Sequence, residues 1–324
     1  MPFERQVAVL FHYLLLEGTI FECSYKEMAL IIIEHWSKLL DEWHLFIHFR
    51  YLCNINQSFK ETSIMSKSKN WTREEIIVAL NLYCKIPFKN SRASHPLVKQ
   101  YAQLIGRTPA ALNLKIGNLG RLDPTLRAKG ITGLSNGSKL DVLVWNEFIA
   151  NPDALAFESE QIIAQYKQQD IETSNHIDKK SLPEGKERLA VVRQRVNQNF
   201  FRDAVLTSYN YQCCISGVSD QSLLEACHIS SWKDDPNNRT NPCNGLCLNS
   251  FFHKAFDNFL FAVTPYYLID ISEKLLDTTE DGAFKDYLAG INNKTVHLPD
   301  RFLPDAKLIE QHYERYNSLK SSLP

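Results

Sequence analysis

The stretch from Leu224 to Asp257 constrains the fold of this chain more than any other part. It contains the segments Leu-Glu-Ala-Cys-His-Ile, Asn-Gly-Leu-Cys-Leu and His-Lys-Ala-Phe-Asp, which begin at positions 224, 244 and 253. Two strands joined by a long loop and followed by a helix would bring four polar side chains together: His228, Asn244, His253 and Asp257. The last two stand at i and i+4 and would share a helix face. The pattern therefore predicts a small α+β unit built around a site.

These segments resemble the HNH endonucleases with a ββα-metal fold, in the branch written Glu-Ala-x-His-Ile, Asn-Gly-Leu-x-Leu and His-x-x-Phe-Asp. Two flanking segments extend the resemblance: Tyr-Gln-Cys-Cys-Ile-Ser-Gly at 211–217 and Arg-Thr-Asn-Pro-Cys-Asn at 239–244. It covers residues 186–310. The resemblance implies a metal-dependent endonuclease that hydrolyses phosphodiester bonds of DNA.

The resemblance also implies a role for each residue of the motif. His228 is the expected general base, a role that suits imidazole because it titrates near neutral pH. Asn244 is expected among the catalytic residues as the organiser of the loop, and His253 as a catalytic residue that also binds the metal. Asp257 is the expected second metal ligand. A mixed nitrogen and oxygen site accepts several divalent ions, so Mg, Mn, Ni and Zn all stay open as the cofactor.

Two positions depart from the family pattern. Cys227 precedes the expected base where relatives often carry Asp or His. Phe252 and His253 stand where close relatives often carry a His-Asp pair. Cys227 is a candidate third metal ligand, and Glu225 is the alternative because it shares a strand face with Cys227. The sequence leaves this choice open.

Parts of the motif also have simpler interpretations. Asn-Gly is the commonest turn dipeptide, and Asp257 could decorate a helix surface. The chain has eight cysteines. Three of them could hold a structural zinc, namely Cys213, Cys243 and Cys247. Their pairs lack the Cys-x-x-Cys spacing, so we expect packed free thiols instead.

Positive charge is concentrated upstream of this motif. The formal net charge of the whole chain is only −1. Residues 66–121, however, contain ten Lys or Arg against two Glu, a local balance of +8. A basic module of this kind is typical of proteins that bind the phosphate backbone of nucleic acids.

The basic module has the sequence pattern of three helices. Thr72 and Glu75 form a capping box for the first, and Pro96–Ile105 has the pattern of a second. Gly106 lies in a tight turn, after which Thr108 caps a third helix. This layout is that of a helix-turn-helix, which would make Arg107, Asn113 and Lys115 candidate DNA contacts. The alternative is a helical packing module that orients the downstream unit.

The same module resembles a leader region found before HNH domains in bacterial proteins of the restriction endonuclease type. The matching segments are Trp-Thr-Arg-Glu-Glu at 71–75, Ile-Gly-Arg-Thr-Pro at 105–109, Leu-Asp-Pro at 122–124 and Gly-Leu-Ser-Asn-Gly-Ser-Lys at 133–139. The resemblance implies restriction, a defence against foreign DNA.

Composition shifts predict the boundaries of the chain's parts. Residues 1–65 are expected to be an N-terminal extension, with Met65 as a candidate natural start, and 66–166 a helical, DNA-binding module. The polar run 167–185 contains Pro183 and Gly185 and is expected to be a linker. The nuclease domain should then occupy 186–324. Arg195 and Arg202 on its first helix are candidate contacts to DNA phosphates.

The apolar segment Val7–Phe21 is interrupted by Glu17 and is too short to span a membrane, so we expect a cytoplasmic protein with no membrane partner. The predicted fold class is α+β: a mainly helical N-terminal region with a helix-turn-helix-like module, then a ββα-metal nuclease domain. DNA is the expected partner, and a homodimer stays open. The alternative function is a catalytically impaired HNH-fold protein that binds DNA.

Overall fold

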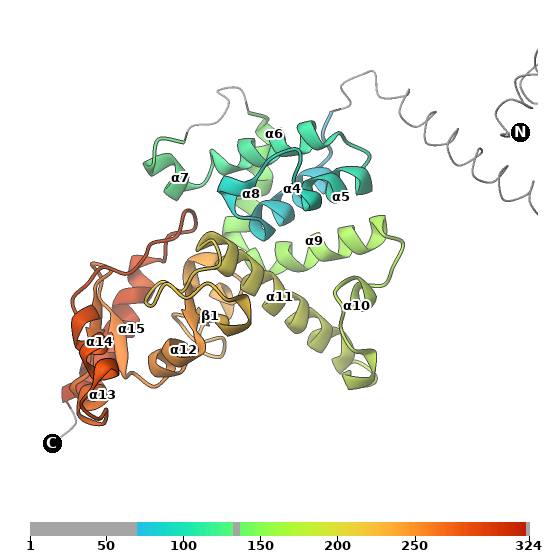
Figure 1. Ribbon diagram of the computed structural model, residues 1–324. Helices are drawn as coiled ribbons and strands as arrows, with labels where there is room; N and C mark the ends of the chain where they lie inside the picture. Colours follow the sequence, from blue (N-terminus) through green and yellow to red (C-terminus); the bar gives the residue numbers. More distant parts are fainter. Residues whose placement is uncertain (1–69, 132–136, 322–324) are drawn as a thin grey trace, which may run out of the picture. The chain divides into compact units, whose positions relative to one another are not determined.

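The computed structural model describes residues 70–131 and 137–321. The predictions for residues 1–65 lie outside this range. We call α4 to α11 the helical region and, after the expectation from the sequence, residues 209–321 the nuclease region. Mainly helical structure comes first and a β-hairpin followed by a helix comes second, so the predicted α+β class is confirmed (Figure 1).

The helical region begins with the three predicted helices. They are α4 (Arg73–Lys85), α5 (Pro96–Leu104) and α6 (Pro109–Gly120). Thr72 and Glu75 form the expected capping box, and Thr108 accepts a hydrogen bond from the backbone of Ala111 at the start of α6. Gly106 between α5 and α6 has φ +66°, a conformation that glycine adopts without strain. Local chain chemistry thus determines where these helices begin.

The helical region continues through α7 (Pro124–Ala128), α8 (Lys139–Ala150), α9 (Pro152–Tyr166), α10 (Ile171–Ser174) and α11 (Glu187–Ser208). Helix α4 lies at its centre and contacts α5, α6, α8, α9 and α11. Residues 75–84 of α4 are all buried. A helix that is apolar nearly all round is stable only when neighbours cover every face, and these five helices do so.

The polar run 167–185, predicted as a linker, packs against the helices on either side of it. It contains α10 and a single 3₁₀ turn, Lys179–Ser181. Ile177 and Leu182 are buried with Phe157 of α9 and Val192 and Val196 of α11. These apolar contacts, with the Arg188–Glu172 ion pair, attach the segment to the helical region.

Helix α11 contacts α4 and α9 and also the first strands of the nuclease region (Figure 1). Strand β1 (Leu224–His228) pairs antiparallel with β2 (Gly245–Asn249), with Cys227 opposite Leu246. Helix α12 (Ser250–Asp257) follows directly. A Cβ atom on Gly245 would lie 2.3 Å from Val205 of α11, so only glycine permits this close approach of β2. The strand-strand-helix order is the predicted ββα unit.

The rest of the nuclease region covers this unit. It comprises β3 (Phe261–Val263), β4 (Ile269–Ile271), α13 (Glu273–Asp277), α14 (Ala283–Ile291) and α15 (Ala306–Ser321). Phe252 and Phe256 of α12 pack with Phe261 of β3. The core side of α12 is thereby fixed, which leaves its other side for polar residues.

A C-terminal segment returns to the helical region. Arg301 is fully buried and donates to the backbone carbonyls of Tyr83 and Cys84 at the end of α4, and to the Thr207 hydroxyl at 2.8 Å. Phe302 stacks on Trp145 in the core of the helical region. A cation at the C-terminal end of a helix is favourable, because the carbonyls there lack partners within the helix. The two regions are therefore packed together through this segment.

None of the helices within residues 70–131 and 137–321 combines the length and apolar content needed to cross a membrane.

Candidate active site and metal centre

The three side chains predicted as metal ligands lie together. Cys227 on β1 and His253 and Asp257 on α12 offer donor atoms within 4.8 Å of one another. The Asp257 carboxylate is 3.5 Å from His253 Nε2 and 4.0 Å from the Cys227 sulfur. Cys227 is fully buried, whereas the Asp257 side chain is 53% exposed. The cluster is therefore closed on the strand side and open to solvent on the helix side.

Glu225 lies behind His253, outside this cluster. Its carboxylate accepts a hydrogen bond from His253 Nδ1 and another, at 2.6 Å, from the Ser250 hydroxyl. The Ser250 bond, and after it the His253 bond, lower the pKa of Glu225. A histidine ligand held this way presents its other nitrogen to the metal, as carboxylate–histidine–metal triads do. Of the two candidate third ligands, Cys227 is thus the one placed to bind an ion, and Glu225 is placed to orient His253.

The donor set fits a divalent transition metal. One sulfur, one imidazole nitrogen and one carboxylate oxygen are the usual ligands of Zn²⁺ and related ions. Burial raises the pKa of the Cys227 thiol well above its usual range. A bound ion would therefore have to displace the thiol proton, as metal ions do when they bind cysteine.

His228, the predicted base, is held by contacts on several sides. Its Nε2 is 2.9 Å from the carbonyl oxygen of Arg239. A carbonyl oxygen only accepts, so Nε2 carries the proton and Nδ1 is the basic nitrogen. The ring stacks on Phe201 of α11 with ring centres 3.8 Å apart and makes a T-shaped contact with Trp232 with ring centres 5.7 Å apart. Burial lowers the pKa of His228, which favours the neutral form that a general base needs.

Asn244 holds the loop between β1 and β2. Its side chain is fully buried, accepts a hydrogen bond from the backbone N–H of Ser230, and donates to the carbonyls of Ser230 and Asn238. These bonds join the start of the loop to its middle. They also hold the backbone at Asn238, so that the carbonyl of the following residue, Arg239, lies within hydrogen-bond distance of His228 Nε2.

Of the two predicted DNA contacts on α11, Arg202 is exposed and Arg195 is partly buried. Arg202 is exposed and donates to the Leu224 carbonyl at 2.9 Å, at the first residue of β1. Its charge contributes to the lowered pKa of Glu225, after the hydrogen bonds to that carboxylate. Arg195 is farther along the helix and donates to the Ser181 hydroxyl at 2.7 Å. Arg202 is therefore the nearer of the two to the metal cluster.

The predicted DNA contacts of the helical region are engaged inside it. Lys115 is 5% exposed and forms an ion pair with the fully buried Asp141 at 2.7 Å. Arg107 is paired with Glu75 at 2.6 Å. Asn113 accepts a hydrogen bond from the Ser91 hydroxyl. A buried and paired ammonium group cannot reach a phosphate, so we assign Lys115 a structural role in place of the predicted DNA contact.

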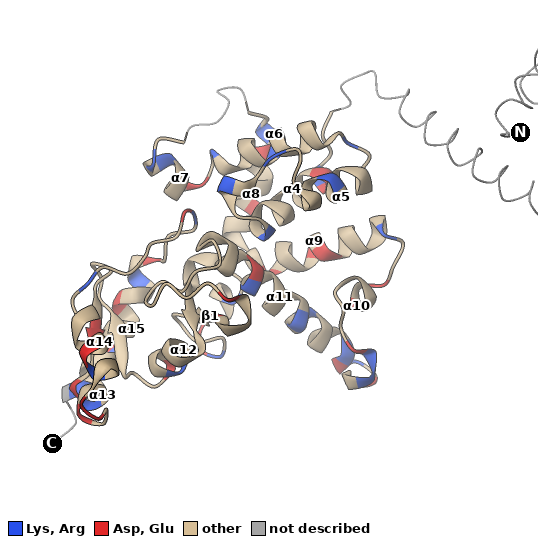
Figure 2. Cartoon of the chain, in the orientation of Figure 1, with Lys and Arg blue, Asp and Glu red and all other residues tan. Residues whose placement is uncertain are grey.

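Acidic residues of α8 and α9 pair with three of the ten basic residues of the module; Figure 2 colours the acidic and basic residues along the chain. Arg73 pairs with Glu147 and Glu158, and Lys85 pairs with Glu160. These acids lie outside residues 66–121 in the sequence. The local balance of +8 is therefore not a surface charge of that size.

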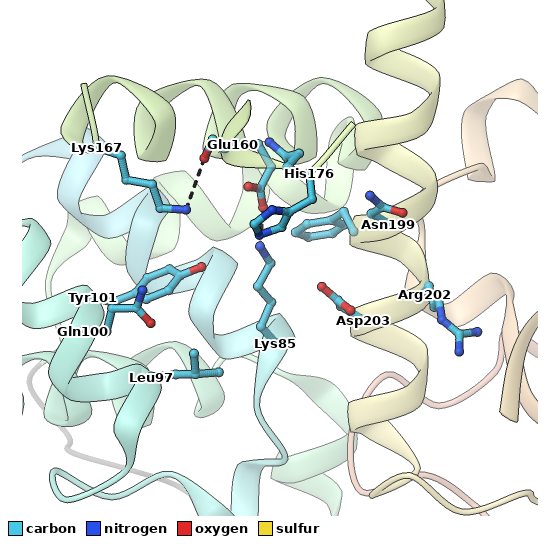
Figure 3. A pocket seen from close by; sticks show the side chains of 13 residues that line it. Lys85, Leu97, Gln100, Tyr101, Glu160, Lys167, His176, Asn199, Arg202 and Asp203 are labelled. Carbon is cyan, nitrogen blue, oxygen red and sulfur yellow. Dashed lines mark hydrogen bonds and ion pairs between the residues drawn. The ribbon is translucent and has the colours of Figure 1, made fainter. Parts of the chain in front are cut away.

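A polar cavity of about 460 Å³ lies among α4, α5, α9, α10 and α11 (Figure 3). Lys85, Tyr101 and Asp203 extend into it from three different helices, and Glu160 closes it beside Lys85. Burial raises the pKa of the Asp203 carboxyl. The cavity shares no residue with the metal cluster.

Several contacts of the site had no sequence signal. Phe201 stacks on His228, but in the sequence it is one of several apolar residues of a helix that indicate only a core. The contact from Arg239 comes from its backbone carbonyl, which every residue has, so no residue type predicts it. A second donor cluster, as the structural zinc alternative requires, is absent from residues 70–131 and 137–321. The six cysteines in those ranges are free thiols.

Comparison with known families agrees with this geometry. The HNH endonuclease family model matches residues 213–264, which include β1, β2, α12 and every residue of the metal cluster. A comparison with curated proteins gives no match. The chain therefore carries an HNH endonuclease domain at residues 213–264, which indicates phosphodiester hydrolysis of nucleic acid.

Proposed function

We propose that the protein is a metal-dependent endonuclease that hydrolyses phosphodiester bonds of DNA, with His228 as its general base. The observation that carries this proposal is the electrostatic influence of His253 and Asp257 on His228, which indicates that the neutral imidazole at the end of β1 lies near two of the three metal donors. Base and metal donors thus lie on one small unit.

The chemistry expected of the chain's own residues follows from the hydrogen bonds of His228. Its Nδ1 takes a proton from a water molecule, which attacks the phosphorus in line with the departing 3′ oxygen. The Nε2–H bond to the Arg239 carbonyl fixes the ring and favours the imidazolium that forms. Phe201 and Trp232 hold the ring plane.

Cys227, His253 and Asp257 would hold the divalent ion. When bound, it supplies positive charge that offsets the negative charge on the phosphate and the leaving oxygen. Among Mg, Mn, Ni and Zn, a thiolate ligand favours the softer Zn and Ni. The exposed side of Asp257 leaves access for a phosphate.

DNA as the substrate and restriction as the role rest on the resemblance of both regions to bacterial restriction endonucleases. We propose Arg202 as a DNA contact because it is exposed beside β1. Arg195, more distant along α11, is a second proposed contact.

Plasmid cleavage tests this function. Supercoiled DNA, with a structured RNA in parallel, is incubated with the full chain and Mg, Mn, Ni or Zn. We expect nicking or linearisation of the plasmid, and a loss of about 10²–10⁴-fold in rate for His228→Ala. His297→Ala is the matched control, because His297 is exposed and is not part of the site. Cleavage at the full rate by His228→Ala would contradict the role of His228.

The complete burial of Cys227, at a position where relatives often carry Asp or His, favours a second candidate, a DNA-binding protein whose metal centre does not load. DNA binding without cleavage under any of the four ions would support this candidate instead.

A further inference from the structure

Arg239 is fixed next to the general base through its own backbone. Its carbonyl oxygen accepts the hydrogen bond from His228 Nε2 at 2.9 Å. The preceding carbonyl, that of Asn238, accepts from the buried Asn244 side chain. The backbone of Arg239 therefore cannot move away from His228 without breaking the hydrogen bonds that organise the loop.

The side chain of Arg239 is also held in place. Its Nε donates to the carbonyl of Trp232 at 2.7 Å, and its guanidinium carbon lies 5.2 Å from the centre of the Trp232 ring. The same indole makes a T-shaped contact with the His228 ring. A guanidinium stacked on an indole loses little further freedom when it binds a ligand.

Within residues 70–131 and 137–321, the side-chain hydrogen bond of Arg239 comes from Nε, and Arg239 takes part in no ion pair, so its two terminal amino groups have no protein partner there. Arg73, Arg107, Arg188, Arg193 and Arg315 each have an acidic partner there. Arg239 is thus a pre-positioned cation beside the catalytic imidazole with its donor fork still available.

We propose that Arg239 binds a backbone phosphate of the nucleic acid next to His228 and so positions the strand for cleavage; the proposal rests on the nuclease function above. A guanidinium fork matches two oxygens of one phosphate. Charges follow one another about every 3.4 Å of rise along a DNA strand, so a cation that contacts the same indole as His228 meets the attacked phosphate or one near it.

The test measures binding of a fluorescein-labelled DNA duplex by anisotropy, in EDTA, over a series of salt concentrations. Arg239→Gln should bind about tenfold more weakly at low salt. The slope of log affinity against log salt should fall by about one, as expected for one lost phosphate contact. Lys233→Gln is the control, since Lys233 is an exposed cation in the same loop. Equal effects of the two substitutions, or no effect of Arg239→Gln, would overturn the proposal.

Arg239→Lys separates phosphate binding from loop structure. Lysine keeps the charge but loses the Nε bond to Trp232, so the salt slope should return to that of the wild type while the affinity recovers only in part. If Arg239→Lys behaves like Arg239→Gln, the side chain acts on loop structure and the proposal fails. Because no cleavage is needed, a wild-type protein that binds DNA without cutting it would contradict the nuclease function alone.

Discussion

The helical region and the nuclease region use their charged side chains in different ways. In the helical region, Lys85, Arg107 and Lys115 pair with acids of the same region, and Lys115 is buried with Asp141. In the nuclease region, polar groups of β1 and α12 converge on a cluster that is half open to solvent. The first arrangement holds helices together, and the second presents donors to a ligand. Positive charge along a sequence thus indicates nucleic-acid binding only when the acids that the fold brings next to it are also counted.

The same contrast applies to α6, which would be the recognition helix of a helix-turn-helix. Its exposed residues include Ala110 and Leu114, whereas its lysine, Lys115, is buried. Direct readout of bases needs exposed polar side chains on that helix. We therefore expect Arg202, on α11, and Arg239, in the loop between β1 and β2, to contribute more to DNA binding than α6 does.

Substitution of Lys115 tests this comparison with the largest expected effect. Lys115→Met leaves Asp141 charged and buried, so the free energy of unfolding should fall by about 3–5 kcal/mol in urea denaturation. The double variant Lys115→Met with Asp141→Leu should recover most of this loss. DNA affinity of the folded protein should stay unchanged. Weaker DNA binding at unchanged stability would instead restore Lys115 as a DNA contact.

His312 tests whether an imidazole near α12 can be purely structural. It stacks on Phe256 at 3.8 Å, and burial lowers its pKa to about 4, from 6.5 in an unfolded chain. Between pH 6.5 and about 4, His312 is protonated in the unfolded state but stays neutral in the native state. Stability should therefore fall between pH 6.5 and about 4, by up to about 3 kcal/mol.

Unfolding by urea at several pH values measures this effect. His312→Leu should flatten the decline of stability with falling pH, whereas His297→Leu, at an exposed position, should leave it as in the wild type. An unchanged decline in His312→Leu would show that other groups cause it.

Substitution of Glu225 tests whether a carboxylate of the nuclease region orients the metal ligand His253. The expected effect, on zinc affinity, is smaller than those above. Glu225→Gln weakens the acceptor for His253 Nδ1, so zinc affinity measured by calorimetry should fall about 10–100-fold. Glu280→Gln, at an exposed acid outside the site, is the control. Equal zinc affinity in both variants would mean that Glu225 does not position the ligand.

The sequence predicted most where its signals are local. Helix starts are predicted by capping residues within the first turn, namely Thr72, Glu75 and Thr108. The i, i+4 spacing alone predicts that His253 and Asp257 share a helix face. Cys227 was a candidate ligand because relatives often carry Asp or His at the position before the base, and it lies with them in the structure. These features need no knowledge of distant contacts.

Tertiary contacts are what the sequence could not predict. The acids that pair with Arg73, Lys85 and Lys115 come from α8 and α9, and the fold alone brings them near. Arg301 and Phe302 return to the helical core from the far end of the chain. Contacts of this kind depend on packing geometry, which leaves no pattern in a single sequence.

The metal centre can be measured directly by X-ray absorption on the zinc-loaded full chain. A centre formed by Cys227, His253 and Asp257 predicts one sulfur at about 2.3 Å and nitrogen or oxygen ligands at about 2.0–2.2 Å. Cys227→Ser should lose the sulfur signal and bind zinc more weakly. A wild-type spectrum without sulfur, or a sulfur signal that persists in Cys227→Ser, would contradict this metal centre.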